Sequence, residues 1–188
     1  MRAFIAIELP IGIKNSLSKI QEKLATERLK VSWVKPHNLH LTLKFLGDIF
    51  PEQLSQIEQI ITEITKTTSG FKVKLETLGV FPNLNAARII WIGANQIPVE
   101  LGQLTQQLQI RLTECNIPRE ERDFCAHITI GRIKYKISTS DLNKAIEKLR
   151  NDLLVRNLEF DCAGITLFES TLKPDGPIYT VLNKFKIN

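Results

Sequence analysis

The sequence predicts an α+β fold with two pseudo-symmetric lobes, each an antiparallel sheet flanked by helices, around a central cleft. Two segments, Leu39–Leu43 and Ala126–Ile130, share one pattern, and each precedes a helical stretch. Their histidines lie 87 residues apart (127 − 40), close to half of the 188-residue chain. Helical and extended segments mix without a strict βαβα rhythm, which favours antiparallel sheets. Because no Gly/Ser-rich linker interrupts the chain, residues 1–188 are expected to form a single bilobal domain.

Four helices are predicted by apolar residues three or four positions apart, a spacing that places them on one face. Pro10, Pro51 and Pro98 suit the start of the first three helices, and Ser140 is expected to cap the fourth. The inward-facing residues are Ile13, Leu17, Ile20 and Leu24; Leu54, Ile57, Ile61 and Ile64; Leu101, Leu104, Leu108 and Leu112; and Leu142, Ile146 and Leu149.

The strands are predicted from short apolar or alternating runs bounded by turn-forming residues. Residues 81–85 are expected to form a loop and residues 173–177 a turn, because both segments are rich in Pro, Asn, Asp or Gly. The expected strands are residues 2–8, 31–34, 39–46, 71–75, 88–92, the second motif as far as Gly131 or Arg132, 158–168 and 178–185.

The repeated motif is apolar–His–apolar–Thr–apolar. On a strand, residues two apart share a face, so His40 lies beside Thr42 and His127 beside Thr129, while the residues between them point into a core. Two of the chain's three histidines occur in this arrangement. A pseudo-twofold pairing of the lobes would bring the two motifs face to face across one cleft.

Two facing imidazoles can divide acid–base chemistry at a phosphorus centre. Histidine exchanges protons near neutral pH. One ring, uncharged, can take a proton from water while the other, protonated, delivers one to the departing oxygen. Hydroxyls from Thr42 and Thr129 can donate hydrogen bonds to the phosphate oxygens, where charge grows in the transition state. The sequence has no nucleotide-binding Gly-rich loop and no carboxylate-rich metal cluster, so a metal-free route is the simplest one.

Composition sets the broad class. A net charge of +5 and a pI near 9.2 favour a polyanionic partner. Three cysteines without a Cys-x-x-Cys pair fit a reducing compartment. The N-terminal segment becomes charged too early for a signal peptide, and no apolar run is long enough to span a bilayer. We therefore expect a cytoplasmic protein, not bound to a membrane.

With these motifs, the sequence resembles the two-histidine phosphoesterase superfamily, most closely its bacterial and archaeal RNA 2′,3′-cyclic phosphodiesterases, also called 2′-5′ RNA ligases. The resemblance rests on residues 40–47 and 127–132 and covers nearly the whole chain. It extends to residues 2–7, 33–36, 81–82, 88–91 and 176–179.

The resemblance implies a bilobal fold and opening of an RNA 2′,3′-cyclic phosphate end to a 2′-phosphomonoester, with tRNA fragments among the candidate substrates. It implies that His40 is the proton donor, His127 the proton acceptor, and Thr42 and Thr129 the phosphate-binding residues. It also implies no cofactor, ATP or metal, a monomer, and a reverse 2′-5′ ligation. The family usually carries a basic residue and proline just before the second motif, whereas this chain has Cys125-Ala126.

Strand alternation predicts where the residues that flank the motifs point. Lys44 shares the predicted face of His40 and Thr42, which makes it a candidate phosphate or RNA contact. Arg132 is a second candidate, although it has the opposite parity from His127 unless the strand ends at Gly131. Alternation assigns Phe45 to the core. His37 and His40 form His-x-x-His, but residues three apart on a strand face opposite ways, which disfavours a zinc site.

Two further functions stay open from the sequence. A related enzyme would open a small cyclic nucleotide, such as ADP-ribose 1″,2″-cyclic phosphate. A non-catalytic RNA-binding module would use the basic cleft without forming product, which the intact pair of motifs disfavours.

Overall fold

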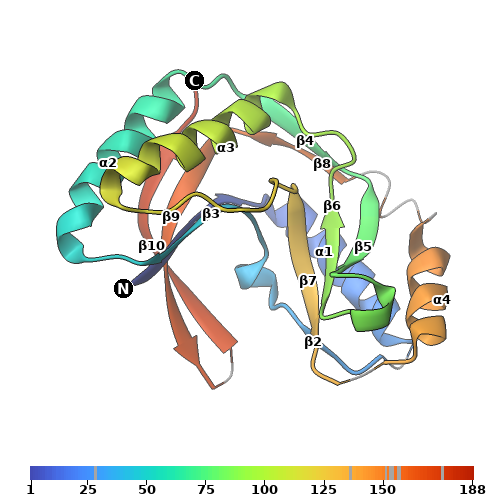
Figure 1. The fold of residues 1–188 in the computed structure, drawn as a ribbon. Coiled ribbons are helices and arrows are strands. Elements are labelled where there is room, and N and C mark those ends of the chain that lie inside the picture. The colour runs from blue at the N-terminus through green and yellow to red at the C-terminus, as the bar shows by residue number, and fades with distance from the viewer. Residues whose placement is uncertain (28, 136, 151, 153–154, 156–157, 175) are drawn as a thin grey trace.

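The computed structural model describes the whole chain except residues 28, 136, 151, 153, 154, 156, 157 and 175. It contains two four-stranded antiparallel sheets, which lie in the two lobes of Figure 1. The first has the order β10 (Gly176–Lys186), β9 (Gly164–Lys173), β1 (Arg2–Glu8) and β3 (His40–Asp48). The second has the order β2 (Val31–Trp33), β7 (His127–Ile133), β6 (Ile89–Gly93) and β5 (Thr77–Phe81). A two-stranded sheet pairs β4 (Phe71–Leu75) with β8 (Leu158–Cys162).

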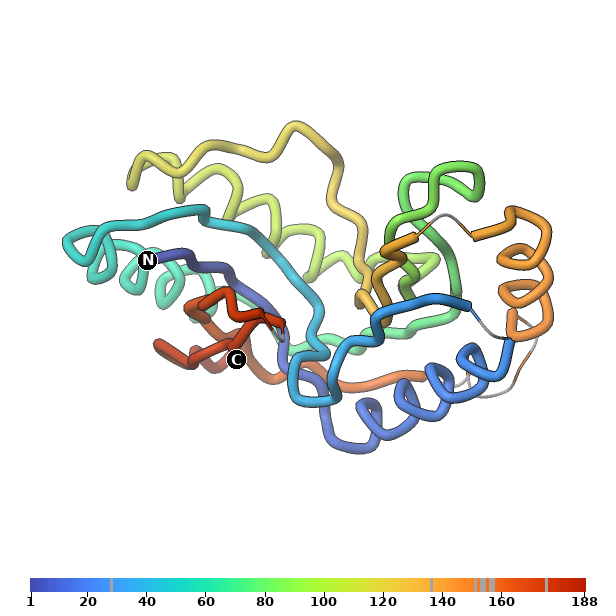
Figure 2. The backbone as a smooth tube through the Cα atoms, turned by 90° about the horizontal axis from the view of Figure 1, so that it is seen from below, coloured from blue at the N-terminus to red at the C-terminus, as the bar shows by residue number. Residues whose placement is uncertain are grey.

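The helices cover the outer faces of these sheets. In Figure 1, α2 (Pro51–Lys66) and α3 (Val99–Arg111) lie together over the first sheet, whereas α1 (Ile11–Ala25) and α4 (Thr139–Arg150) flank the second. Figure 2, viewed from below, separates the same two groups on either side of the gap between the lobes. The predicted α+β, bilobal architecture is confirmed. None of the helices described in the structure is long and apolar enough to cross a bilayer.

The lobes do not correspond to the two halves of the chain. The N-terminal half contributes α1 and β2 to the lobe of β7, while α3 from the C-terminal half packs with α2 beside β3. The chain therefore crosses between lobes several times. This interleaving holds β3 and β7, the two motif strands, in contact with each other.

Most predicted elements match, and the differences have local causes. Strand β5 is not predicted by the sequence, because Gly79 interrupts its apolar pattern. A Cβ at Gly79 would lie 2.5 Å from the ring of Trp91, so glycine is required by the packing of this ring. The predicted strand 158–168 is divided at Ala163 into β8 and β9. The first of these pairs with β4 and the second with β10. The predicted turn 173–177 includes residue 175, which lies outside the described residues.

The start of the fourth helix also differs from the prediction. It begins at Thr139, and the backbone N–H of Asp141 lies 3.5 Å from the hydroxyl of Ser138. Ser138, rather than Ser140, is therefore the capping residue. Three of the helix's four buried residues, Leu142, Ile146 and Leu149, are the predicted ones.

Candidate active site

The two motif histidines open the two strands that meet between the lobes. His40 is the first residue of β3 and His127 the first residue of β7, and both rings are half-buried. The Nδ1 of His40 is 2.7 Å from the carbonyl oxygen of Asn38, and the Nδ1 of His127 is 2.8 Å from that of Cys125. A carbonyl oxygen can only accept, so each Nδ1 carries the hydrogen and each Nε2 is left for other chemistry.

Each histidine is also held by aromatic rings. Phe4 and Tyr179 pack against His40 with ring centroids 4.9 Å and 5.1 Å away. Phe81 lies edge-on to His127 at 5.0 Å. These contacts restrict rotation of the imidazoles, so the backbone bond and the aromatic packing together fix the direction in which Nε2 points.

A bulge follows the threonine in both motif strands. Opposite β1, Ala6 pairs with Thr42 and Ile5 with Lys44, which leaves Leu43 as the extra residue. Opposite β6, Trp91 pairs with Thr129 and Ile90 with Gly131, which leaves Ile130 as the extra residue. Because a bulge inserts one residue, it reverses which face the following side chains occupy.

This reversal overturns three expectations based on strict alternation. Lys44 is fully buried and does not share the face of His40 and Thr42, so it is no phosphate or RNA contact. Phe45, expected in the core, is 59% exposed. Arg132, which was assigned the opposite parity, is exposed and close enough to His40 to lower the pKa of that ring.

Lys44 instead holds a loop over the strand. Its Nζ donates to Oε1 of Gln109 (2.7 Å) and to the carbonyl oxygen of Pro118 (2.9 Å). The same Gln109 oxygen accepts the backbone N–H of Glu120, whose carboxylate accepts the backbone N–H of Phe45. Burial lowers the pKa of Lys44, and the charge of Glu120 opposes this shift. The network fixes the loop that leads to the second motif.

The bulge in β7 has its own buried support. The side chain of Gln21 on α1 donates from Nε2 to the carbonyl oxygens of Val34 and Ile130, both at 2.8 Å. The Ile130 oxygen also accepts the backbone N–H of Val34. Gln21 thus gives a second donor to the carbonyl oxygen of the residue that the bulge leaves unpaired opposite β6.

The surroundings of His40 disfavour its charged form. Burial lowers the pKa of His40 to about 4, and the positive charges of Lys14, Arg132 and His127 act in the same direction. The bond to Asn38 opposes them. The imidazole is therefore mainly neutral at pH 7, and the contribution of His127 places both histidines within electrostatic range of each other.

A cavity of about 630 Å³, called the catalytic cavity below, lies beside His127. Thr42 and His127, from the two motifs, both line it, with three phenylalanines around them: Phe45, Phe81 and Phe124. Arg88, Arg122, Asp123 and Glu120 supply its charged groups. His40 and Thr129 are half-buried on their strands and are not among its lining residues. His37 is exposed in the short 3-10 helix Pro36–Asn38.

Comparison with known protein families identifies the family of this chain. The chain matches the family described as LigT like Phosphoesterase over residues 7–91 and again over residues 92–179. It belongs to the LigT-like phosphoesterases. The resemblance found in the sequence is thereby confirmed, and the two successive matches agree with the repeated motif strands.

Relatives of this LigT-like chain carry one name. A protein of Methanocaldococcus jannaschii named RNA 2′,3′-cyclic phosphodiesterase is 36% identical over 98% of this chain and 100% of its own length. One of the same name from Aquifex aeolicus is 34% identical, over 98% and 96%. Among solved structures, TT0787 of Thermus thermophilus superposes with a TM-score of 0.82 at 30% identity, covering 100% of this chain and 98% of that one.

The chain departs from the family pattern at Cys125-Ala126, just before the second motif, where main-chain carbonyl groups make the contacts. Cys125 offers its carbonyl oxygen to His127, and the carbonyl oxygen of the buried Ala126 accepts the N–H of Ala94. Because main-chain carbonyl oxygens accept these two hydrogen bonds, the bonds do not require a particular side chain at either position. The sequence does not single out Phe4, Arg88 or Tyr179, because none of them lies near a motif along the chain. The signal for these three was the resemblance carried by residues 2–7, 88–91 and 176–179. No such signal marks Gln21.

Proposed function

We propose that this chain hydrolyses RNA 2′,3′-cyclic phosphate ends to 2′-phosphomonoesters without a metal ion, with His40 as general acid and His127 as general base. The observation that carries the proposal is the matched pair of imidazoles on neighbouring strands, each with Nδ1 bonded to a backbone carbonyl and Nε2 left for proton transfer. The name shared by relatives at 33–36% identity supports the same reaction.

In the proposed reaction, His127 takes a proton from water as the water oxygen bonds to phosphorus. The bond from phosphorus to the 3′-oxygen breaks, and His40 gives that oxygen its proton. The phosphate stays on the 2′-oxygen. If a 5′-hydroxyl replaces water, the same transfers form a 2′-5′ linkage, so reverse ligation needs no additional group.

The phosphate oxygens would be bound by Thr42 and Thr129, with Arg132 adding charge. Thr42 faces the cavity, and Arg132 lies within electrostatic range of both His40 and Tyr179. A guanidinium is suited to phosphate because its donors match the spacing of two oxygens. Lys44 has no part in this contact.

The terminal nucleoside would occupy the cavity of about 630 Å³, where a base can stack on phenylalanine rings. Phe45 is the best placed, since it is exposed, lines the cavity and follows Thr42 by three residues. The bulge at Leu43 is what turns this ring toward the cavity.

Because the pKa of His40 is low, the substrate is also needed to protonate this ring. A ring with a pKa of about 4 holds a proton in only a small fraction of molecules at pH 7. An anionic phosphate placed beside it favours the protonated form and raises its pKa. We infer that binding of the substrate itself charges the general acid.

The deciding assay uses RNA that ends in a 2′,3′-cyclic phosphate, with EDTA present, and identifies the position of the phosphate in the product. His40→Gln and His127→Gln are each expected to lower kcat by at least about a hundredfold, the usual contribution of a general acid or base. His37→Gln, at the exposed third histidine, is the matched control. Full turnover in both active-site variants would rule out the proposal, as would binding of RNA without product.

Substrate identity is tested in parallel. Turnover of ADP-ribose 1″,2″-cyclic phosphate in preference to the RNA end would instead assign the same histidine chemistry to a small nucleotide.

A further inference from the structure

A second hollow of about 440 Å³ lies next to the catalytic cavity. Arg88 lines both of them. The backbone of Arg88 is fixed on either side, since its N–H donates to the carbonyl oxygen of Phe81 and its own carbonyl oxygen accepts the N–H of Ile133. The two spaces are therefore adjacent, and one arginine stands between them.

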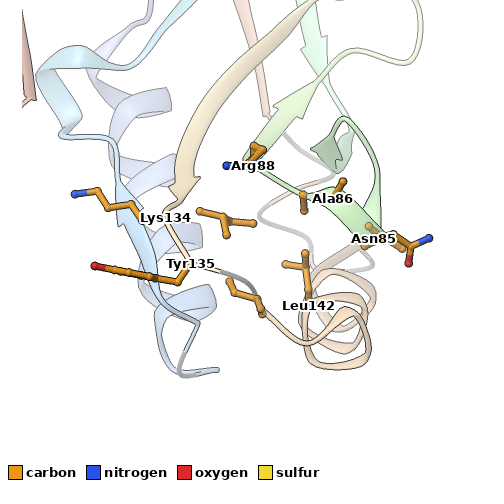
Figure 3. A pocket seen from close by; sticks show the side chains of 10 residues that line it. Asn85, Ala86, Arg88, Lys134, Tyr135 and Leu142 are labelled. Atoms are coloured by element: carbon orange, nitrogen blue, oxygen red, sulfur yellow. The ribbon is translucent and has the colours of Figure 1, made fainter.

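The lining of this hollow combines apolar side chains with polar groups, and the two charged residues that line it are both basic. Figure 3 shows Arg88 at one end and Leu142 at the other, with Ala86 between them. Lys134 and Tyr135 leave the end of β7 in one direction, away from Leu142. The residues that line it include no Asp or Glu, and within the described part of the chain no carboxylate forms an ion pair with Arg88 or Lys134.

We propose that this hollow binds a nucleotide upstream of the cyclic-phosphate end, so that the protein holds an RNA strand rather than a single nucleotide. The inference rests on the proposed function, because it takes the terminal nucleotide to lie in the catalytic cavity. The strand would leave that cavity past Arg88, which contacts its phosphodiester backbone.

The chemistry of the hollow fits a nucleotide. The apolar side chains of the lining can accept the face of a base, its polar groups can bond to the edge of the base, and Arg88 and Lys134 can attract the phosphates on either side. Strand β7 runs from His127 at the catalytic cavity to Ile133 at the second hollow. Seven residues of strand span roughly 20 Å, a distance that a short oligonucleotide can follow. Arg132 is exposed on the same strand and continues the row of cations.

The test compares cyclic-phosphate substrates of one, two, three and four nucleotides. The wild-type kcat/KM is expected to rise by about fivefold or more as the length increases, the lower end of the effect of stacking one base. Ala86→Trp fills the hollow and is expected to reduce this gain to less than about twofold, with turnover of the mononucleotide unchanged. Ser55→Trp is the matched control, because Ser55 is exposed on α2 and lines neither hollow.

Charge is tested separately by Lys134→Gln. This variant is expected to weaken the salt dependence of kcat/KM for the longest substrate only. Lys72→Gln, at an exposed lysine on β4, removes the same charge at a site outside the proposed track.

The outcomes separate the two proposals. If the mononucleotide is opened but length brings no gain, or if Ala86→Trp retains the gain, the upstream site is wrong and the proposed function stands. If no cyclic phosphate is opened, the proposed function fails. The upstream site is then tested by binding. Competition experiments measure the affinities for an oligonucleotide and for a mononucleotide that each end in a 2′-phosphate. Ala86→Trp must weaken binding of the oligonucleotide and leave binding of the mononucleotide unchanged.

Discussion

His40 is expected to make the folded protein sensitive to acid. Its pKa is about 4 in the folded chain and about 6.5 when exposed, so the unfolded state binds more protons between these values. The free energy of unfolding therefore has its full value above pH 6.5 and declines as the pH falls from 6.5 toward 4. At pH 5 this one ring should lower the free energy of unfolding by about 2 kcal/mol, a value that follows from the pKa of His40 in the unfolded and in the folded state.

The assay is urea denaturation at pH 7.5 and pH 5.0 for the wild type, His40→Asn and His37→Asn. The His40→Asn variant removes the titrating group, so its loss of stability on acidification should be smaller than that of the wild type by about 2 kcal/mol. His37→Asn, at an exposed ring three residues away, should follow the wild type. Equal losses in the wild type and His40→Asn would refute the burial of His40 as the cause.

Two further predictions concern the supports of the site. Gln21→Met should lower the free energy of unfolding by about 1–3 kcal/mol, because it removes two hydrogen bonds, one to the partly buried carbonyl oxygen of Val34 and a buried one to that of Ile130. A loss below about 0.5 kcal/mol in urea denaturation would contradict this. Lys44→Met should free the loop at Pro118 that Lys44 holds, and so raise KM with little change in kcat, because residues of this loop line the cavity while the histidines stay in place. Steady-state kinetics with a KM equal to that of the wild type would contradict the second prediction.

Much of the fold could be predicted because its signals are local. The helix α2 begins at Pro51, and strand β1 covers Arg2–Glu8, both as the sequence indicates. Three of the four inward residues predicted for α2, namely Ile57, Ile61 and Ile64, are buried. Periodicity reports which face of an element is apolar, and this information is present in a short window of sequence.

The bulges could not be predicted, because they depend on pairing between distant strands. Nothing within Leu43–Phe45 signals an extra residue, since the insertion exists only relative to β1. The consequence is large, because one inserted residue exchanges the positions of Lys44 and Phe45 between core and surface. Likewise, Gln21 resembles an ordinary polar residue of a helix until the carbonyl oxygen of Ile130 is placed next to it.

The two motif strands have the same geometry but differ after the bulge, and this difference separates their tasks. The residue after the bulge is buried in both strands: Lys44 anchors a loop, whereas Gly131 has no side chain because a Cβ would lie 2.6 Å from Val31. The next residue is exposed in both, and it is Phe45 in one strand and Arg132 in the other. A ring suits a base and a guanidinium suits a phosphate. In the proposed complex, the N-terminal motif would therefore select the nucleoside, and the C-terminal motif would hold the charge that the reaction moves.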